Sequence, residues 1–528
     1  MKKNSLVVVP ASCCLIWLNL SVPVFSSDTP AGGDSGEFTL PEVVKIALQN
    51  SPNISLQQLG VEKAKAGTRI ASGAFNVNGR IAINSSHSTT KILDVESLHP
   101  TDRALLPPSA TDIEIQSTNS SLSTGLVKSF RTGVATDLSV TTLQADPDML
   151  SRLGLTTNKT SVKFTVTVPL LKGSGRVSAA AAELAAGLNY EATLADFQYK
   201  ISATVLDTVT NFWNYVSTRW YLERVQESKQ RVQNWIERAS ASGHNLHGYL
   251  EDKKGKLIDT QQALDEAKIA LATVIGIPAQ QLDSLGKPVA DFPLEWKEAV
   301  NRFDHQKLQD IWLREAEDKR LDLKATRLRQ KIAKVNLDKA RKDVLPQLNL
   351  SLGTGYNGFS QYNDFDRFTE SYYKNVNGMD YSAGLTLSYP FGNDIAGGTL
   401  ELNQADYQQK ALDTDEKIRS IRLDMQNDLS NVYGRMQKAV QVRETILAYR
   451  QALEDLLSDS AVLQDETKLL TIMELENKYL EARGDGARAL ADLASAITKA
   501  RFNTGTLIVT NETSGEADLA NLSTLPGW

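Results

Sequence analysis

Ser161-Val-Lys-Phe-Thr-Val-Thr-Val168 alternates strictly between polar and apolar residues, and Pro169 follows it directly. Because successive side chains of a strand point to opposite faces, the four apolar residues share one face, which predicts a β-strand. Pro169 has no N–H group to donate and ends the strand. A turn follows in which Gly173 and Gly175 are free to adopt positive φ angles. The next segment, from about Val177 to Ser240, contains no proline and predicts a helix of roughly 96 Å at 1.5 Å per residue.

The same pattern occurs a second time. Tyr381-Ser-Ala-Gly-Leu-Thr-Leu-Ser-Tyr389 alternates, Pro390 ends this second strand, and Gly392 lies in the turn after it. A second long helix is predicted from about Gly398 to Leu463. Its apolar residues recur at spacings of three and four that add up to an 11-residue repeat, which is typical of nearly straight supercoiled helices. An ordinary long coiled coil is the alternative interpretation of either helix taken alone.

Two separations along the chain indicate an internal duplication. Pro169 and Pro390 are 221 residues apart, and Gly276 and Gly505, which end two shorter predicted helices, are 229 residues apart. Near-equal separations at distant sites predict two copies of one unit, with about eight residues inserted in the second copy.

The composition excludes few classes of function. The chain has 528 residues and a formal net charge of −6, and this balance offers no basic patch for nucleic acid. Met1–Ser26 contains two lysines, an apolar run and small residues at its end, which predicts a secretory signal peptide. Both cysteines, Cys13 and Cys14, lie inside this segment, so the exported chain is expected to have no disulfide bond. Lipidation at Cys13 is a less favoured alternative.

Amphipathic strands, rather than an apolar helix, are the candidates for contact with a membrane. No run of about 18 apolar residues follows Ser26, so no transmembrane helix is predicted. Leu122–Phe130 and Val134–Leu143 predict an extra hairpin that turns at Arg131-Thr-Gly133, so we expect four strands in the first copy and two in the second. Strands of this kind are typical of outer-membrane barrels, although a soluble sandwich is the alternative for any single strand.

Five short motifs resemble those of the TolC-like outer-membrane efflux protein family. They are a strand-to-helix turn, two repeat-opening signatures and two helix-ending signatures: Pro169–Arg176, Asn50-Ser-Pro52, Arg320-Leu-Asp-Leu323, Leu271–Gly276 and Ala500–Gly505. The second opening signature departs from the family pattern, because Leu321 stands where the family usually has proline. The resemblance covers about residues 38–507, and the order and double occurrence of the motifs make it specific.

The resemblance implies a mainly α fold with membrane β-strands. Two strand–long-helix-hairpin repeats would form a trimeric outer-membrane β-barrel and a periplasmic α-helical tunnel. The expected organisation is a signal peptide, a first repeat, an inter-repeat linker, a second repeat and a flexible C-terminal tail, at residues 1–26, 38–276, 277–318, 319–507 and 508–528. We expect six strands in each chain and eighteen in a trimer, where the family usually has four and twelve.

The function implied by the resemblance is that of a passive exit duct in the outer membrane. The expected partners are two further copies of the chain, a periplasmic adaptor protein, an inner-membrane pump and outer-membrane lipid. Small-molecule efflux and type I protein secretion both remain open, because the pump determines specificity. The alternatives are a periplasmic adaptor, which would have one hairpin, and a structural coiled coil, which would need no amphipathic strands.

The candidate site is the far end of the two helical hairpins. Each long helix must turn and return, and we expect both turns at the end farthest from the strands. The candidate gate residues lie at or after these turns: Gly243, His244, His247, Glu251, Asp252, Asp465, Glu466, Lys468, Thr471 and Glu474. We expect the charged side chains among them to hold the closed state through ion pairs. The usual glycine of the family at the second turn is replaced by Lys468.

The remaining motifs favour no chemistry. His244 and His247 are three residues apart with Glu251 nearby, but a solvated turn is a better interpretation than a metal site. Gly173-Ser-Gly175 lacks the Gly-Lys-Ser/Thr ending of a nucleotide-binding loop. No nucleophile and base group together in the pattern, so we expect neither a cofactor nor an enzyme.

Overall fold

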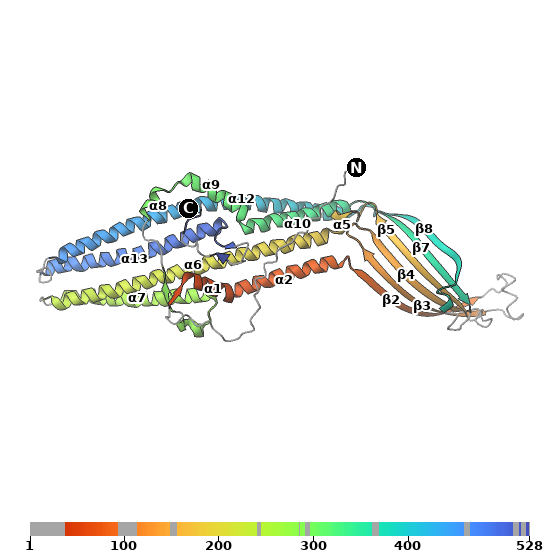
Figure 1. Cartoon of the computed structure of the whole chain (residues 1–528), viewed down its shortest axis with the longest axis horizontal. Coiled ribbons are helices and arrows are strands. Elements are labelled where there is room, and N and C mark those ends of the chain that lie inside the picture. Colours follow the sequence, from red (N-terminus) through yellow and green to blue (C-terminus); the bar gives the residue numbers. More distant parts are fainter. Residues whose placement is uncertain are drawn as a thin grey trace, which may run out of the picture. The chain divides into compact units, whose positions relative to one another are not determined.

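The computed structural model divides the chain into two compact units (Figure 1). The sheet unit comprises residues 62–193 and 326–413, and the helical unit comprises residues 1–61, 194–325 and 414–528. The structure describes residues 37–92, 113–147, 156–239, 244–284, 286–290, 296–361, 369–458, 465–510, 517–518 and 524–526. The predicted signal peptide and both cysteines lie outside these residues.

The sheet unit contains one antiparallel sheet of six strands in the order β2-β3-β4-β5-β7-β8. The strands are β2 (Val77–Ile92), β3 (Ile113–Ser129), β4 (Ala135–Pro147), β5 (Thr157–Pro169), β7 (Gln347–Gln361) and β8 (Asn375–Ser388). The prediction of six strands, with the extra β3–β4 hairpin, is confirmed. Pairing of β5 with β7 joins the two repeats, and it leaves β2 and β8 as the two edges of the sheet.

The register of the six strands separates apolar from polar side chains over the rows that contain Leu126 and Val140. One row on the apolar face crosses all six strands through Gly79, Leu126, Leu138, Phe164, Thr354 and Tyr381. A neighbouring row on the opposite face runs through Arg80, Gly125, Ser139, Lys163, Gly355 and Asp380. On the apolar face, Leu126 is 51% exposed and Tyr381 is 80% exposed. The described residues therefore leave this part of the apolar face uncovered, whereas farther along the same face Thr142 and Thr160 are buried and hydrogen-bond to Tyr372 and Ser371.

The turn between β3 and β4 contacts the turn that follows β5. Gly133 has a φ of 90°, and a Cβ atom there would collide with the backbone oxygen of Gly173. The amide of Gly175 donates a hydrogen bond to the carbonyl of Thr132 over 2.9 Å. Gly173 and Gly175 adopt φ angles of 82° and 79°, as a turn after Pro169 requires. After β8, Pro390 leads into a turn in which Gly392 has a φ of 89°.

Helices make up most of the remaining chain. The helices of the first repeat and the linker are α1 (Leu40–Asn50), α2 (Pro52–Gly73), α5 (Arg176–Ala179), α6 (Ala181–Arg238), α7 (His244–Ile275), the 3₁₀-helix η2 (Ala279–Ser284), α8 (Lys297–Asn301) and α9 (His305–Lys319). Those of the second repeat are α10 (Leu321–Asp343), α12 (Asp394–Leu457) and α13 (Glu466–Asn503). Among the described helices, none combines the length and the apolar content needed to cross a membrane.

The core of the helical unit forms between the long helices and the inter-repeat linker. The predicted stripe on α12 is buried at Met425, Val432 and Met436. Trp312 of α9 is fully buried in the same cluster, together with Phe212 of α6. Two short sheets complete the unit: β1 (Glu37–Thr39) pairs in parallel with β6 (Lys287–Val289), and β9 (Val509–Thr510) pairs with β10 (Ala517–Asp518).

The end of the tail also contacts this core. The indole Nε1 of Trp312 donates to the carbonyl of Pro526 over 3.0 Å. Arg501 donates to the carbonyl and the hydroxyl of Thr524, and Leu525 is 2% exposed. Within the segment that the sequence predicts to be flexible, residues 524–526 are therefore held by side chains of α9 and α13.

A glycine closes each repeat against the start of that repeat. Gly276 follows α7 with a φ of 74°, and a Cβ atom there would lie 2.6 Å from the carbonyl oxygen of Asn50, just before α2. Gly505 follows α13 with a φ of 73°, and its Cβ atom would lie 2.9 Å from the carbonyl oxygen of Lys319, just before α10. The same contact thus occurs at the same place in both copies, which supports the duplication.

We expect Gly276→Ala and Gly505→Ala each to lower the free energy of unfolding by about 1–3 kcal/mol. Alanine disfavours the left-handed backbone conformation at these positions, and its Cβ atom would collide with a carbonyl group. Gly434→Ala is the matched control, since Gly434 lies within α12 with open space around it. It should stabilise the protein by about 0.5–1 kcal/mol. Denaturant unfolding followed by circular dichroism measures all three; destabilisation by all three alike would contradict the special role of the two glycines.

Candidate functional site

The ends of the two helical hairpins pack together within the helical unit (Figure 1). Their apolar contact, here called the tip cluster, contains Val232 and Trp235 of α6, Leu453 of α12, and Leu469, Ile472 and Met473 of α13. Tyr249 of α7 packs against it. All four helices therefore meet near the ends of α6 and α12 and the starts of α7 and α13.

Two of the predicted gate residues stabilise the start of α13. Asp465 is the N-cap residue, and its carboxylate accepts hydrogen bonds from the amides of Thr467 and Lys468 over 3.0 and 3.3 Å. Thr471 donates its hydroxyl to the carbonyl of Thr467. Gly243 and the side chains of His244 and Glu466 lie outside the described residues. Asp465 thus has a capping function that is independent of any gate.

The other charged candidates form ion pairs within their own helices. Glu251 pairs with Lys254 at 2.7 Å, and Asp252 pairs with Lys256 at 3.6 Å on α7. On α13, Glu474 pairs with Lys478 at 3.2 Å, and on α7 the side chain of His247 is exposed. Exposed pairs at this spacing contribute about 0.3–0.5 kcal/mol each. The predicted ion-pair network between the two turns stays a prediction.

A partly buried network that no sequence motif predicted joins the two hairpins next to the tip cluster. Arg231 of α6 pairs with Glu476 of α13 at 2.7 Å, and the side chain of Glu476 is fully buried. Arg483 pairs with Glu227 at 2.9 Å. Partial burial raises the pKa of Glu227, but hydrogen bonds from Arg483 and Arg224 leave this pKa below its usual value.

Lys253 of α7 lies next to this network as a buried cation. Its side chain is fully buried, and its Nζ atom has no hydrogen-bond partner among the residues that the structure describes. Burial, helped by the positive charge of Lys256 and opposed by the attraction of Glu476, lowers the pKa of Lys253 from 10.5 to about 8. The protonated amine is therefore held in a position that disfavours its charge.

One sequence signal could have found these two buried residues. Glu476 continues the buried stripe of Leu469, Ile472 and Met473 at helical spacing, and Leu480 follows it four residues later. Lys253 likewise begins the stripe that continues through Thr260, Leu264 and Leu271 on α7. A charged residue at an apolar stripe position indicates burial, but only the fold identifies its neighbours, since Arg231 and Glu476 are 245 residues apart.

We expect Lys253→Met to raise the free energy of unfolding by about 1–3 kcal/mol below pH 8, because it removes the cost of burying a charge. The native pKa lies below the unfolded value, so the wild-type penalty is complete below about pH 8 and fades as the pH rises toward 10.5. The increase in the free energy of unfolding of Lys253→Met should therefore shrink between about pH 8 and pH 10.5.

Lys254→Met is the control, since Lys254 is exposed and pairs only with Glu251 of its own helix among the described contacts. Thermal unfolding at pH 7, 9 and 10.5 measures both variants. A gain for Lys253→Met that does not change with pH would contradict the buried charge as its cause.

The polar face of the sheet is the second candidate surface. Arg80 of β2 pairs with Asp137 of β4 at 3.0 Å, across the intervening strand β3. Asn357 of β7 donates a hydrogen bond to Asp380 of β8. Lys163 lies between Ser139 and Gly355 in the row described above. Small and polar residues predominate on this face, which makes it suited to contact with water.

Comparisons with known proteins agree with this architecture. Residues 312–458 match the family model of outer membrane efflux proteins. No curated protein matches the sequence. Three similar solved structures are the outer membrane channels CmeC from Campylobacter jejuni and MtrE from Neisseria gonorrhoeae, and the outer membrane protein VceC from Vibrio cholerae.

The similarity to these channels extends over most of the chain at low sequence identity. CmeC is 12% identical with a TM-score of 0.58, covering 88% of this chain and 85% of its own. VceC is 14% identical with a TM-score of 0.58, covering 88% and 96%. MtrE is 14% identical with a TM-score of 0.57, covering 88% and 88%. The chain thus has the fold of these three outer-membrane proteins, its residues 312–458 match the outer membrane efflux protein model, and the predicted resemblance to the TolC-like family is confirmed.

Proposed function

We propose that this protein is the outer-membrane exit duct of an export system and conducts substrates passively from the periplasm to the outside. The observation that carries the proposal is the six-stranded sheet, which has an uncovered apolar face and two open edges. An uncovered apolar face suits lipid, and the opposite polar face suits an aqueous lumen. The protein is thereby a channel and not an enzyme.

The open edges call for further copies of the chain. A strand edge inside a membrane would leave backbone N–H and C=O groups without partners, at a cost of several kcal/mol for each group. Pairing of β2 in one copy with β8 in the next would satisfy both edges in a closed ring. A homotrimer of six-stranded sheets has eighteen strands, and barrels of this size leave an aqueous channel.

The hairpin tips are the surface we assign to the partners. A periplasmic adaptor would contact the turns beside the tip cluster, and an inner-membrane pump would supply energy and substrate. The duct has no energy source of its own in this scheme. Small molecules and secreted proteins are both possible cargo, since the pump selects them.

The sheet's placement is tested by arginine substitutions at two adjacent residues of β4. Val140 lies on the apolar face opposite Thr124 and Val162, whereas Thr141 lies on the polar face opposite Ser123 and Ser161. We expect Val140→Arg to cost about 2–4 kcal/mol at the middle of the lipid layer and to reduce the trimer recovered from outer membranes.

Thr141→Arg is the matched control and should assemble at the wild-type level. The measurement is the mass of the detergent-extracted protein by light scattering, together with its amount in the outer-membrane fraction. A soluble monomer in the wild type, or equal losses in both variants, would reject the membrane barrel.

The gate is tested by a single cysteine at position 465. If the second turn lies near the threefold axis, Asp465→Cys should form disulfides between copies and block export while assembly is unchanged. Cys13 and Cys14 are the only native cysteines and lie in the predicted signal peptide, so they should not interfere. Glu444→Cys is the control, because Glu444 faces Lys297 of α8 at 3.7 Å and should not crosslink. Crosslinked protein that exports at the normal rate would show that the tip is not the gate.

A further inference from the structure

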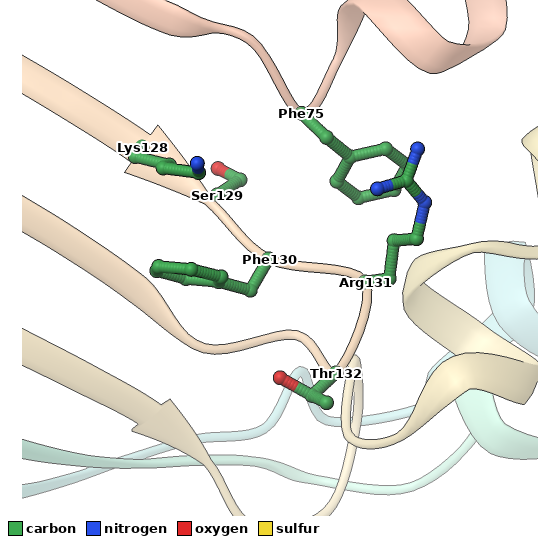
Figure 2. Close-up of a pocket in the computed structure, with 6 residues that line it drawn as sticks. All are labelled: Phe75, Lys128, Ser129, Phe130, Arg131 and Thr132. Carbon is green, nitrogen blue, oxygen red and sulfur yellow. The ribbon is translucent and has the colours of Figure 1, made fainter. Parts of the chain in front are cut away.

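A pocket of about 310 Å³ lies at the end of β3, at the turn of the extra hairpin. It is lined by Phe75, Lys128, Ser129, Phe130, Arg131 and Thr132 (Figure 2). All six residues belong to the sheet unit. The pocket combines two aromatic rings, two cationic side chains and two hydroxyl groups, a set that differs from every other surface of the protein described above.

The two cations have different electrostatic partners. The Arg131 guanidinium lies over the ring of Phe75, with Cζ 4.8 Å from the ring centroid, and its Nε atom donates to the carboxylate of Glu183 over 2.6 Å. Glu183 thereby balances the charge of Arg131. The Nζ atom of Lys128 lies 5.3 Å from the centroid of Phe130, and no carboxylate among the described residues pairs with it. The pocket therefore carries about one uncompensated positive charge.

Lys128 marks the border of the apolar face. Its row continues through Val166 and Leu352, and the next row contains Leu126 and Leu138. A lysine at this place can extend its apolar stem along the sheet and keep its ammonium group in the polar layer beyond. Phe130 is 39% exposed beside it. The charge therefore lies directly at the edge of the surface that lipid would cover.

The position of the pocket selects one side of the membrane. The turn that forms it is hydrogen-bonded to the turn after β5, through the amide of Gly175 and the carbonyl of Thr132. That second turn leads into α5 and α6. In the proposed orientation the helices extend into the periplasm, so the pocket faces the inner leaflet, which consists of phospholipids.

We propose that this pocket binds the phosphate headgroup of an anionic phospholipid, with Lys128 as the main charge and the acyl chains along the apolar face of β3 and β4. The hydroxyl of Thr132 is available for a further hydrogen bond, and the rings of Phe75 and Phe130 contact the apolar part of the lipid. A free phosphate ion would gain nothing from the rings or the apolar face. Bound lipid would anchor the extra hairpin at a set depth. This inference rests on the proposed placement of the sheet in the outer membrane.

Native mass spectrometry of the full-length protein, extracted from outer membranes in mild detergent, tests the proposal. The protein is titrated with phosphatidylglycerol, with phosphatidylethanolamine of the same chains, and with inorganic phosphate. We expect phosphatidylglycerol to bind more tightly than phosphatidylethanolamine. Lys128→Gln should weaken the binding of phosphatidylglycerol about fivefold, because one basic residue near an anionic surface contributes about 1 kcal/mol.

Two further variants separate the pocket from general charge. Lys128→Arg keeps the charge and should bind as the wild type does. Lys163→Gln removes a lysine from the opposite, polar face of the sheet and should leave lipid binding unchanged. The same spectra report the oligomer mass, so a variant that fails to assemble is recognised.

The possible results have distinct meanings. Equal binding by Lys128→Gln and the wild type, or equal losses in Lys128→Gln and Lys163→Gln, would overturn the lipid site. Displacement of phosphatidylglycerol by millimolar phosphate would assign the pocket to free phosphate instead, and would also overturn it. Failure to recover the protein from outer membranes would reject the proposed function itself, whereas a membrane trimer without lipid preference would reject only this inference.

Discussion

The unsatisfied backbone groups at the two edges of the sheet are the constraint on which the rest of the structure depends. The order β2-β3-β4-β5-β7-β8 leaves each outer strand with one paired and one open side. In water such edges invite aggregation, and in lipid their cost is prohibitive. The closed ring of copies proposed above would satisfy the edges and would place the exposed part of the apolar face against lipid. The extra β3–β4 hairpin widens that ring without changing this logic, because it adds two fully paired strands inside the sheet.

The duplication supplies a second constraint, at the base of the helical unit. Each repeat ends at a glycine in the left-handed region. Gly276 lies against the carbonyl group of Asn50, just before α2, and Gly505 lies against that of Lys319, just before α10. Any larger residue would push the end of the repeat away from its start. The linker adds to this closure, since Trp312 of α9 is fully buried and bonds to the last described residues of the chain. The two copies are therefore joined by packing as well as by sequence.

Both apolar packing and ion pairs hold the helices together at the tip of the hairpins. The tip cluster provides apolar contact among four helices, whereas the pairs Arg231–Glu476 and Arg483–Glu227 link α6 to α13 by charge. Buried charges contribute little net stability, because desolvation offsets their attraction. Lys253 is costly for the same reason. A tip held by such groups can rearrange without exposing a large apolar core, which is consistent with the gate proposed above.

Local patterns in the sequence determined the elements of this protein. Alternation predicted six strands and 11-residue spacing predicted the buried stripe of α12, because each of these patterns depends only on neighbours within a few residues. The duplication was predicted from prolines and glycines that recur at near-equal separations. The tertiary structure alone decided which distant residues meet. It aligned Leu126, Leu138 and Phe164 in one row, placed Arg231 against Glu476, buried Lys253, and held residues 524–526 against α9 and α13. Such contacts depend on packing between different segments, some of them hundreds of residues apart, and no periodicity in the chain encodes them.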